Sequence, residues 1–259
     1  MTATEVMEAV RRHHDSVCEK VNERNVSVIM TVLDGSQNYG LDHAGSDIDT
    51  FSIVLPSVCD MSQLKEPITT EYWVEDGKCS VKDVRLALNL LIKTSPNSLE
   101  WFTSKFQIKE PDYENILVYY LAEPILNQMI HSNYFHMLKA CEGMSHQLSK
   151  RNMPVGKRYS HCLRMIDMWE TYLKEDKHPL SFRSEENRLI ALNAKLSQNE
   201  DMQEKCEEVA DYFHRIAKEF SITEEQKQKE QEGQKLVRQF EYDLIMRHLY
   251  REMMLTTYN

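Results

Sequence analysis

The sequence predicts an α+β protein, in which a small mixed β-sheet with flanking helices is followed by a helical domain. The first part of the chain contains short apolar and β-branched runs bounded by turn signals, which are typical of strands. Beyond Leu99 the apolar residues recur at helical spacing instead. We expect a first domain over residues 1–110 and a helical domain over residues 111–259. The expected strands lie near residues 26–33, 46–55, 69–75 and 78–81.

The predicted helices have start and stop signals. Thr2 and Glu5 fit a capping box for a first helix, on which regularly spaced valines form an apolar stripe. A helix from Asp83 to Thr94 follows the last strand and is stopped by Pro96. The remaining expected helices span Leu117–Leu126, Tyr134–Ser149, Tyr159–Leu173, Glu185–Leu196, Met202–Phe220 and Glu224–Met254.

The composition is that of an ordinary globular protein. Hydrophobic residues make up 41% and charged residues 28% of the chain, and no apolar run is long enough to cross a bilayer. The start lacks the pattern of a signal peptide and the cysteines are scattered without metal-ligand spacing, so we expect reduced thiols in a cytoplasmic protein without a membrane partner. The net charge of −10 argues against a protein that coats nucleic acid through its overall field.

The most informative segment contains a Gly-Ser pair and a carboxylate pair that are separated by ten residues. The β-branched run Val26–Leu33 suits a buried strand, so Gly35 and Ser36 are expected at a strand end. A glycine there lets backbone N–H groups come close to a ligand oxygen, and a serine hydroxyl beside it can donate to phosphate. This half of the segment therefore predicts an anion site.

Asp47 and Asp49 begin the next predicted strand. Successive strand side chains point to opposite faces, so the two carboxylates would project the same way, about 7 Å apart, while Ile48 faces the core. Mg²⁺ takes one or two carboxylates together with substrate phosphate oxygens, so this pair opposite a Gly-Ser loop predicts a site for Mg²⁺ or Mn²⁺ and a nucleotide. Each half alone has a plainer interpretation, as a solvated acidic turn or a simple Gly-Ser turn.

Basic residues are concentrated locally despite the negative net charge. Lys157, His161 and Arg164 are spaced four and three apart, so on a helix beginning near Gly156 they share one face. That face is suited to a triphosphate or an RNA backbone in a cleft opposite the aspartates. On spacing alone, a solvated basic face that pairs with nearby acidic helices is an equal alternative.

The Gly-Ser pair at 35–36 and the Asp-Ile-Asp at 47–49 resemble the signature of the DNA polymerase beta-like nucleotidyltransferase superfamily. The chain is most similar to the branch that includes YcgL-type and RNA-ligase-associated predicted nucleotidyltransferases, whose loop also contains a pair like Tyr39-Gly40. The stretch 84–100 resembles the branch's helix that ends in a Pro-Asn turn and a Glu, and 157–164 resembles its basic helix. The likeness therefore covers most of the chain.

The resemblance implies a nucleotidyltransferase core that moves a nucleoside monophosphate from an NTP to a hydroxyl acceptor and releases pyrophosphate. Asp47 and Asp49 would be catalytic and would bind Mg²⁺ or Mn²⁺. The residues assigned to nucleotide binding are Gly35, Ser36, Tyr39, Lys157, His161 and Arg164.

Members of the superfamily carry a third carboxylate on a later strand, which completes metal binding and can take the proton of the attacking hydroxyl. The best-aligned position in this chain holds Lys78. Asp76, two residues earlier, is our assignment for this catalytic role, with Glu71 and Glu75 also available. Asp76-Gly77 is equally consistent with a simple hairpin turn. Without a third acid the chain would bind nucleotide and not transfer it.

Two other functions stay open at this point: a catalytically degenerate nucleotide-binding regulatory module, and a non-enzymatic helical interaction protein. The sequence does not distinguish an RNA 3′ end, a tRNA, a protein hydroxyl or a small molecule as the acceptor. It predicts no oligomeric state.

Overall fold

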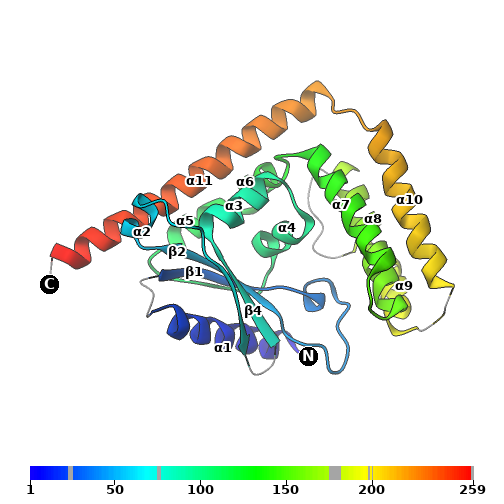
Figure 1. Cartoon of the computed structure of the whole chain (residues 1–259), viewed down its shortest axis with the longest axis horizontal. Coiled ribbons are helices and arrows are strands. Elements are labelled where there is room, and N and C mark those ends of the chain that lie inside the picture. Colours follow the sequence, from blue (N-terminus) through cyan, green and yellow to red (C-terminus); the bar gives the residue numbers. More distant parts are fainter. Residues whose placement is uncertain (23–25, 75–76, 175–181, 198, 200, 258–259) are drawn as a thin grey trace.

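A five-stranded mixed sheet with strand order β3-β4-β2-β1-β5 forms the centre of the first half of the chain (Figure 1). The computed structural model describes residues 1–22, 26–74, 77–174, 182–197, 199 and 201–257. The strands are β1 (Val26–Leu33), β2 (Thr50–Pro56), β3 (Thr69–Val74), β4 (Gly77–Asp83) and β5 (Gln107–Lys109). β2 and β4 run parallel, whereas the other neighbouring pairs are antiparallel. The predicted α+β fold with a small mixed sheet is confirmed.

Helix α1 (Ala3–Asn22) covers one face of the sheet. Its N-terminus is closed by the predicted capping box, in which the Thr2 N–H donates to the Glu5 carboxylate (2.7 Å) and the Glu5 N–H donates to the Thr2 hydroxyl (3.3 Å). The predicted valine stripe is buried, with Val6 packed near Leu33 and Ile48, and Val17 near the strands farther along. The apolar spacing of this helix therefore sets which side of α1 meets the sheet.

The opposite face of the sheet is covered by α3 (Val84–Ile92) and α4 (Pro96–Thr103), with α11 (Glu224–Thr257) outside them (Figure 1). Trp101 on α4 stacks on Phe51 of β2, with ring centroids 3.6 Å apart. The helix predicted to run to Thr94 and stop at Pro96 already ends at Ile92. Pro96 instead begins α4, where its missing N–H has no helical partner to lose. This packing fixes α4 directly above the start of β2.

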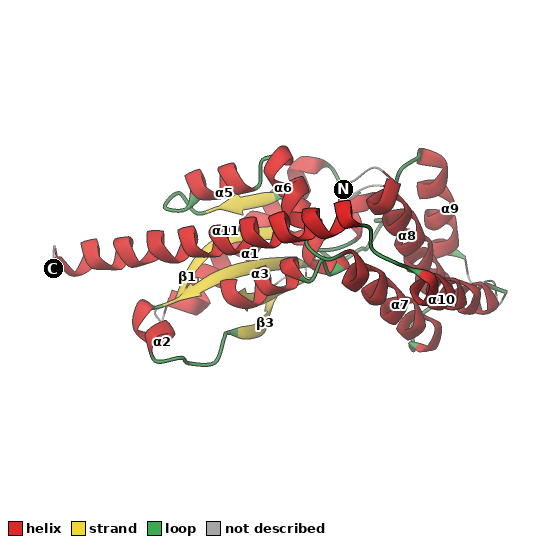
Figure 2. Cartoon of the chain, turned by 90° about the horizontal axis from the view of Figure 1, so that it is seen from above, coloured by secondary structure: helices red, strands yellow, loops and turns green. Residues whose placement is uncertain are grey.

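The other helices are α2 (Val58–Ser62), α5 (Glu114–Tyr120), α6 (Glu123–Ile130), α7 (Tyr134–Lys150), α8 (Val155–Lys174), α9 (Glu185–Leu196) and α10 (Met202–Glu219). Figure 2 shows α7 to α10 gathered at one end of the molecule, from which α11 runs back along the sheet half. One continuous cluster of buried apolar side chains extends from the sheet through α3 and α4 into these helices. In the described part of the chain, no helix is long and apolar enough to span a membrane.

Several elements differ from the sequence prediction, among them α2 and α4, which were not predicted, and α8, which begins at Val155 and not at Tyr159. The second strand begins at Thr50 and not at residue 46, so Asp47 and Asp49 precede it. The helix expected from Leu117 to Leu126 is two helices, α5 and α6, because Pro124 fits only the first turn of a helix. The short edge strand β5 was not predicted, since three residues are too few for a period to be recognised.

Candidate active site

The site begins where β1 ends beside the start of β2. Leu33 pairs with Thr50 in the antiparallel ladder, and the Asp34 N–H donates to the Asp49 carbonyl (2.8 Å), so the pairing continues one residue beyond the strands. Side chains directly opposite each other in such a pair lie on the same face. Asp34 and Asp49 therefore both face the side of the sheet away from α1, while Ile48 is buried beneath α1.

The Gly-Ser loop forms a short 3₁₀ turn over Ser36–Tyr39. Gly35 has a φ of 138° in the region that favours glycine, which lets the chain leave β1 sharply. The Asn38 amide donates to the Leu33 carbonyl (2.8 Å), and the Gln37 amide donates to the Asp47 carbonyl (2.9 Å). The first bond fixes the Gly-Ser loop to the end of β1 and the second holds it against the aspartate segment, so the two halves of the sequence motif are one structural unit.

Helix α9 fixes the far end of the same loop. The Arg188 guanidinium donates to the Gly40 carbonyl (2.7 Å) and the Lys195 ammonium donates to the Leu41 carbonyl (2.5 Å). Helix α9 is in turn held close to α8, since a side chain at Gly156 would collide with the carbonyl groups of α9's last turn. The helical half of the chain thus supplies one wall of a cleft, and the strand ends supply the other.

The cleft between these walls contains about 930 Å³ of space including its open mouth. It brings together most of the residues predicted from the sequence. The strand-side lining includes Asp34, Gly35, Ser36, Tyr39, Asp47 and Asp49. The helix-side lining includes Arg151, Lys157, His161 and Lys195. The acidic residues and the Gly-Ser loop therefore face the basic residues across one opening.

Asp47 and Asp49 are available for a cation. Asp47 is exposed and Asp49 is partly exposed, and neither forms an ion pair within the described part of the chain. The Asp49 carboxylate accepts a hydrogen bond from the backbone N–H of Lys78 (3.3 Å), which orients it without neutralising its charge. Carboxylate oxygens of this kind are the donors that Mg²⁺ and Mn²⁺ prefer, so the donor set fits a hard divalent cation.

Asp34 is a site residue that the sequence analysis missed. Burial raises the pKa of its carboxyl to about 6, Asp49 adds to that rise, and the Trp101 indole favours the charged form less strongly. An acid directly before a Gly-Ser turn was a signal in the sequence, but only the pairing with Asp49 shows which way it points. Arg151, which directly follows α7, and Lys195 on α9 were also missed, because only the packing of the helices brings them to the cleft.

His161 lies in the basic wall, as the helical spacing predicted. Burial, together with Lys157 and Lys195, lowers the pKa of His161 to about 4. The same causes, burial and Lys157, lower the pKa of Lys195. His161 is therefore neutral near pH 7.

Arg164 faces a neighbouring cavity of about 830 Å³ that shares Asp34, Tyr39 and His161 with the cleft. It forms a buried ion pair with Glu100 on α4, and its guanidinium lies 4.2 Å from the centre of the Tyr39 ring. Its charge is thus already balanced by a protein carboxylate. The role predicted for Arg164 as an outer phosphate ligand stays a prediction.

The third carboxylate expected on a later strand is not placed by the structure. Asp76 and Glu75 lie outside the described residues. Lys78 stands beside Asp49 in the parallel pairing of β4 with β2, and its ammonium donates to Glu71 (3.1 Å). Glu71 is therefore engaged with Lys78, and Asp34 is the additional described acid that lines the cleft with Asp47 and Asp49.

Three comparisons with known proteins were made for this chain. A solved nucleotidyltransferase-like protein from Exiguobacterium sibiricum 255-15 is similar to this chain at 14% sequence identity, with 82% of this chain and 75% of that chain covered and a TM-score of 0.31. A comparison with curated proteins finds no significant match. The sequence model of a family described as RlaP, RNA repair pathway DNA polymerase beta family, matches residues 9–245, which include the Gly-Ser loop, both aspartates and the basic helix. This chain therefore belongs to the RNA repair pathway DNA polymerase beta family, RlaP.

Proposed function

We propose that this member of a polymerase beta-like nucleotidyltransferase family is a metal-dependent enzyme that moves a nucleoside monophosphate from an NTP to a hydroxyl group and releases pyrophosphate. One observation carries the proposal: Asp47 and Asp49, which form no ion pair with any described residue, face a basic wall across the same cleft. A nucleoside triphosphate needs both features, because its phosphates require positive charge and its metal requires oxygen ligands.

The chain's own residues would position the triphosphate between the two walls. Gly35 permits close approach of the backbone, and the Ser36 hydroxyl is a hydrogen-bond donor for the β- and γ-phosphates. Lys157 and Lys195 approach from the opposite wall and offset the phosphate charge. Arg151 stands beside them at the same opening, so the leaving pyrophosphate would remain next to cations.

Asp47 and Asp49 are the proposed ligands of Mg²⁺ or Mn²⁺, with Asp34 beside them. When bound, the cation would bridge phosphate oxygens, stabilise charge on the leaving group and help to lower the pKa of the attacking hydroxyl. The positions of the three acids suit this role because they share one face of the strand ends. We propose Asp34 as an acid that supports the pair, since it lines the same cleft. Asp76, which lies outside the described residues, stays a prediction for this role.

We propose an RNA hydroxyl as the acceptor, most simply a 3′ end. The support is the family description, which places its members in an RNA repair pathway. The open mouth of the cleft between the strand ends and α8 leaves room for an RNA strand that approaches from solvent. Nothing in the lining identifies a preferred base, so all four NTPs are candidates.

The test is transfer of label from each α-phosphate-labelled NTP to RNA with Mg²⁺ or Mn²⁺. Asp47→Ala combined with Asp49→Ala is expected to abolish labelling while circular dichroism and thermal unfolding stay close to those of the wild type. Asp42→Ala is a matched control, because it removes an acid from the same loop that does not line the cleft. Equal labelling by the double variant would refute the assignment of the aspartates.

A degenerate nucleotide-binding module is the second candidate, favoured by Lys78 standing beside Asp49 where an acid is expected. Such a module would bind nucleotide but release no pyrophosphate, whichever NTP and whichever acceptor were supplied. Measurement of pyrophosphate release by the wild-type protein separates the two candidates. A non-enzymatic helical protein would give no nucleotide-dependent thermal shift at all.

A further inference from the structure

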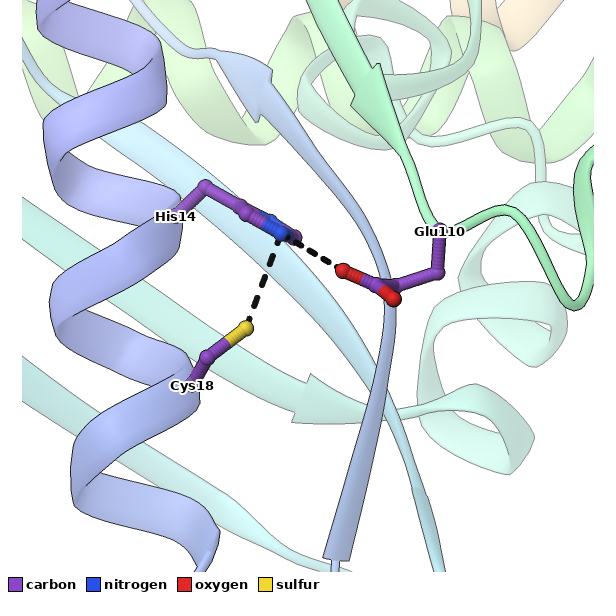
Figure 3. A group of neighbouring side chains, drawn as sticks. All are labelled: His14, Cys18 and Glu110. Atoms are coloured by element: carbon purple, nitrogen blue, oxygen red, sulfur yellow. Dashed lines mark hydrogen bonds and ion pairs between the residues drawn. The ribbon is translucent and has the colours of Figure 1, made fainter.

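A second group of metal-ligating side chains lies on the other side of the sheet, under α1 and away from the cleft (Figure 3). It consists of His14 and Cys18 on α1 and Glu110, which directly follows β5. One donor atom from each lies within 4.8 Å of the other two. The three side chains point toward one another from two separate elements, as Figure 3 shows.

The distances between these donor atoms fit a small tetrahedral cation. The His14 Nε2 atom lies 2.8 Å from the Glu110 Oε1 atom and 3.6 Å from the Cys18 Sγ atom. In a tetrahedral zinc site, with bonds of about 2.0 Å to nitrogen and oxygen and about 2.3 Å to sulfur, neighbouring donors are roughly 3.3–3.7 Å apart. The observed separations therefore need only small side-chain movements to surround an ion.

The surroundings hold the histidine in the orientation that a metal ligand requires. The Nδ1 atom of His14 is 3.0 Å from the Thr31 hydroxyl, which itself is 2.7 Å from the Ser52 hydroxyl on β2. Metal-bound histidines commonly have their second ring nitrogen fixed in this way. The Glu110 backbone N–H donates to the Ile29 carbonyl (3.0 Å), so the carboxylate also comes from a fixed position.

Two of the three side chains are only partly buried, so one side of the proposed site is open to solvent. His14 is 5% exposed, whereas Cys18 and the Glu110 side chain are partly exposed. Water can therefore reach a fourth coordination position, and an ion can enter without unfolding α1. Spacing of i and i+4 places His14 and Cys18 on the same face of the helix, directly over the sheet.

We propose that His14, Cys18 and Glu110 form a site for Zn²⁺ that joins α1 to the edge of the sheet, separate from the oxygen-lined cleft. The choice of cation follows from the donors, because thiolate and imidazole select Zn²⁺ over Mg²⁺, whereas the carboxylates of the cleft suit Mg²⁺. The ion stabilises the packing of α1 and takes no part in nucleotidyl transfer. The site does not depend on the function proposed for the cleft.

The test is titration of the metal-free full-length protein with Co²⁺, followed by absorption spectroscopy. A thiolate ligand gives a sulfur-to-cobalt charge-transfer band in the near ultraviolet, which reports Cys18 directly. We expect one equivalent of Co²⁺ to produce the band and one equivalent of Zn²⁺ to remove it. A roughly 100-fold excess of Mg²⁺ should leave it unchanged, because Mg²⁺ rarely accepts sulfur ligands.

Variants separate this site from the other thiols and from the cleft. Cys18→Ser should remove the band, whereas Cys59→Ser, an exposed cysteine, and Cys206→Ser, which lies next to Cys162, should keep it. Glu110→Gln should keep a weaker site, with an apparent Kd for Zn²⁺ raised about 10-fold or more. Asp47→Ala with Asp49→Ala should bind Co²⁺ with the same band, which makes the result independent of nucleotidyl transfer.

Two results would overturn the proposal: no charge-transfer band in the wild-type protein at saturating Co²⁺, or a band of equal strength in Cys18→Ser. An unchanged Kd in Glu110→Gln would contradict the three-ligand site. Thermal unfolding with Zn²⁺ is a second readout, since an ion that binds only the folded protein raises Tm. This rise should be seen in Cys59→Ser and be lost in Cys18→Ser.

Discussion

Asp34 is a residue of the cleft whose ionisation is opposed by its surroundings. Burial raises its pKa to about 6, and the nearby Asp49 carboxylate acts in the same direction. An acid whose pKa is higher in the folded protein than in the unfolded chain binds its proton more tightly when folded. Folding is therefore opposed by the charge of Asp34, and this opposition grows as the pH rises from about 4 to about 6.

We predict that Asp34→Asn stabilises the metal-free protein by about 2 kcal/mol at neutral pH, because the amide has no charge to bury. The gain should disappear below about pH 4, where Asp34 is protonated in both states. Urea unfolding in EDTA across this pH range measures the difference in free energy of unfolding. Asp47→Asn, at an exposed position of the same cleft, should change stability by less than about 0.5 kcal/mol. A gain that is equal at both ends of the pH range would contradict the argument.

Among the secondary-structure elements, those with a complete local signal were predicted well. β1 has the predicted bounds because its β-branched run ends at a glycine turn, and α9 has them because Ser184 caps its start. The beginning of β2 was predicted too early, since residues 46–49 alternate as a strand would but reach beyond the ladder that β1 and β4 provide. A sequence pattern shows which side chains alternate, but a strand also needs a neighbouring strand to which its backbone can hydrogen-bond.

For the candidate site, too, the part that lies in one local segment was predicted and the part that depends on packing was not. Gly35, Ser36, Asp47 and Asp49 lie in one short segment, so local spacing was enough to bring them together. The contribution of α9 was not visible, because Lys195 reaches the cleft only through the close contact of α8 and α9 at Gly156. Contacts that arise from the packing of distant elements leave no regular spacing in the sequence.

Gly77 is the point where β4 touches the aspartate segment. A side chain there would collide with the backbone of Ile48, which lies between Asp47 and Asp49. We predict that Gly77→Ala destabilises the protein by about 2 kcal/mol through overpacking. We also expect it to lower the transfer rate about 100-fold, because a shift of the Ile48 backbone moves the carboxylates of Asp47 and Asp49 out of position.

Gly143 provides the matched control for this prediction. It lies on the exposed side of α7 with open space around its Cα, so Gly143→Ala should stabilise the protein by about 0.5–1 kcal/mol and leave the transfer rate unchanged. Chemical denaturation and a single-turnover labelling assay measure both effects. The same transfer rate in Gly77→Ala and the wild type would show that the position of Ile48 does not set that of the carboxylates.

On the scale of the whole molecule, charge is separated between the two walls of the cleft. The chain has a net charge of −10, yet the wall formed by α8 and α9 presents cations to the opening. Burial and neighbouring positive charges lower the pKa of His161 and Lys195, although Asp42 acts in the opposite direction on Lys195, so positively charged groups are crowded together on this wall. The opposite wall carries Asp34, Asp47 and Asp49, which repel a triphosphate unless a divalent cation lies between them.

This separation predicts opposite effects of the two walls when the divalent cation is removed. In Mg²⁺, both Asp47→Ala with Asp49→Ala and Lys157→Ala with Lys195→Ala should weaken NTP binding. In EDTA, the lysine variant should still bind more weakly than the wild type, but the aspartate variant should bind more tightly, by about 5-fold in Kd. That factor corresponds to about 1 kcal/mol of repulsion between charges a few ångströms apart near water.

Calorimetric titration with a non-hydrolysable NTP in both buffers measures the four affinities, and added salt should reduce every difference because the groups are partly exposed. Tighter binding by the aspartate variant in EDTA excludes a general loss of structure as the reason for its weaker binding in Mg²⁺. If the aspartate variant bound more weakly in both buffers, Asp47 and Asp49 would be contacting the nucleotide directly and not through a cation. The reversal of sign is therefore the measurement that separates a metal site from an ordinary hydrogen-bonding site in this cleft.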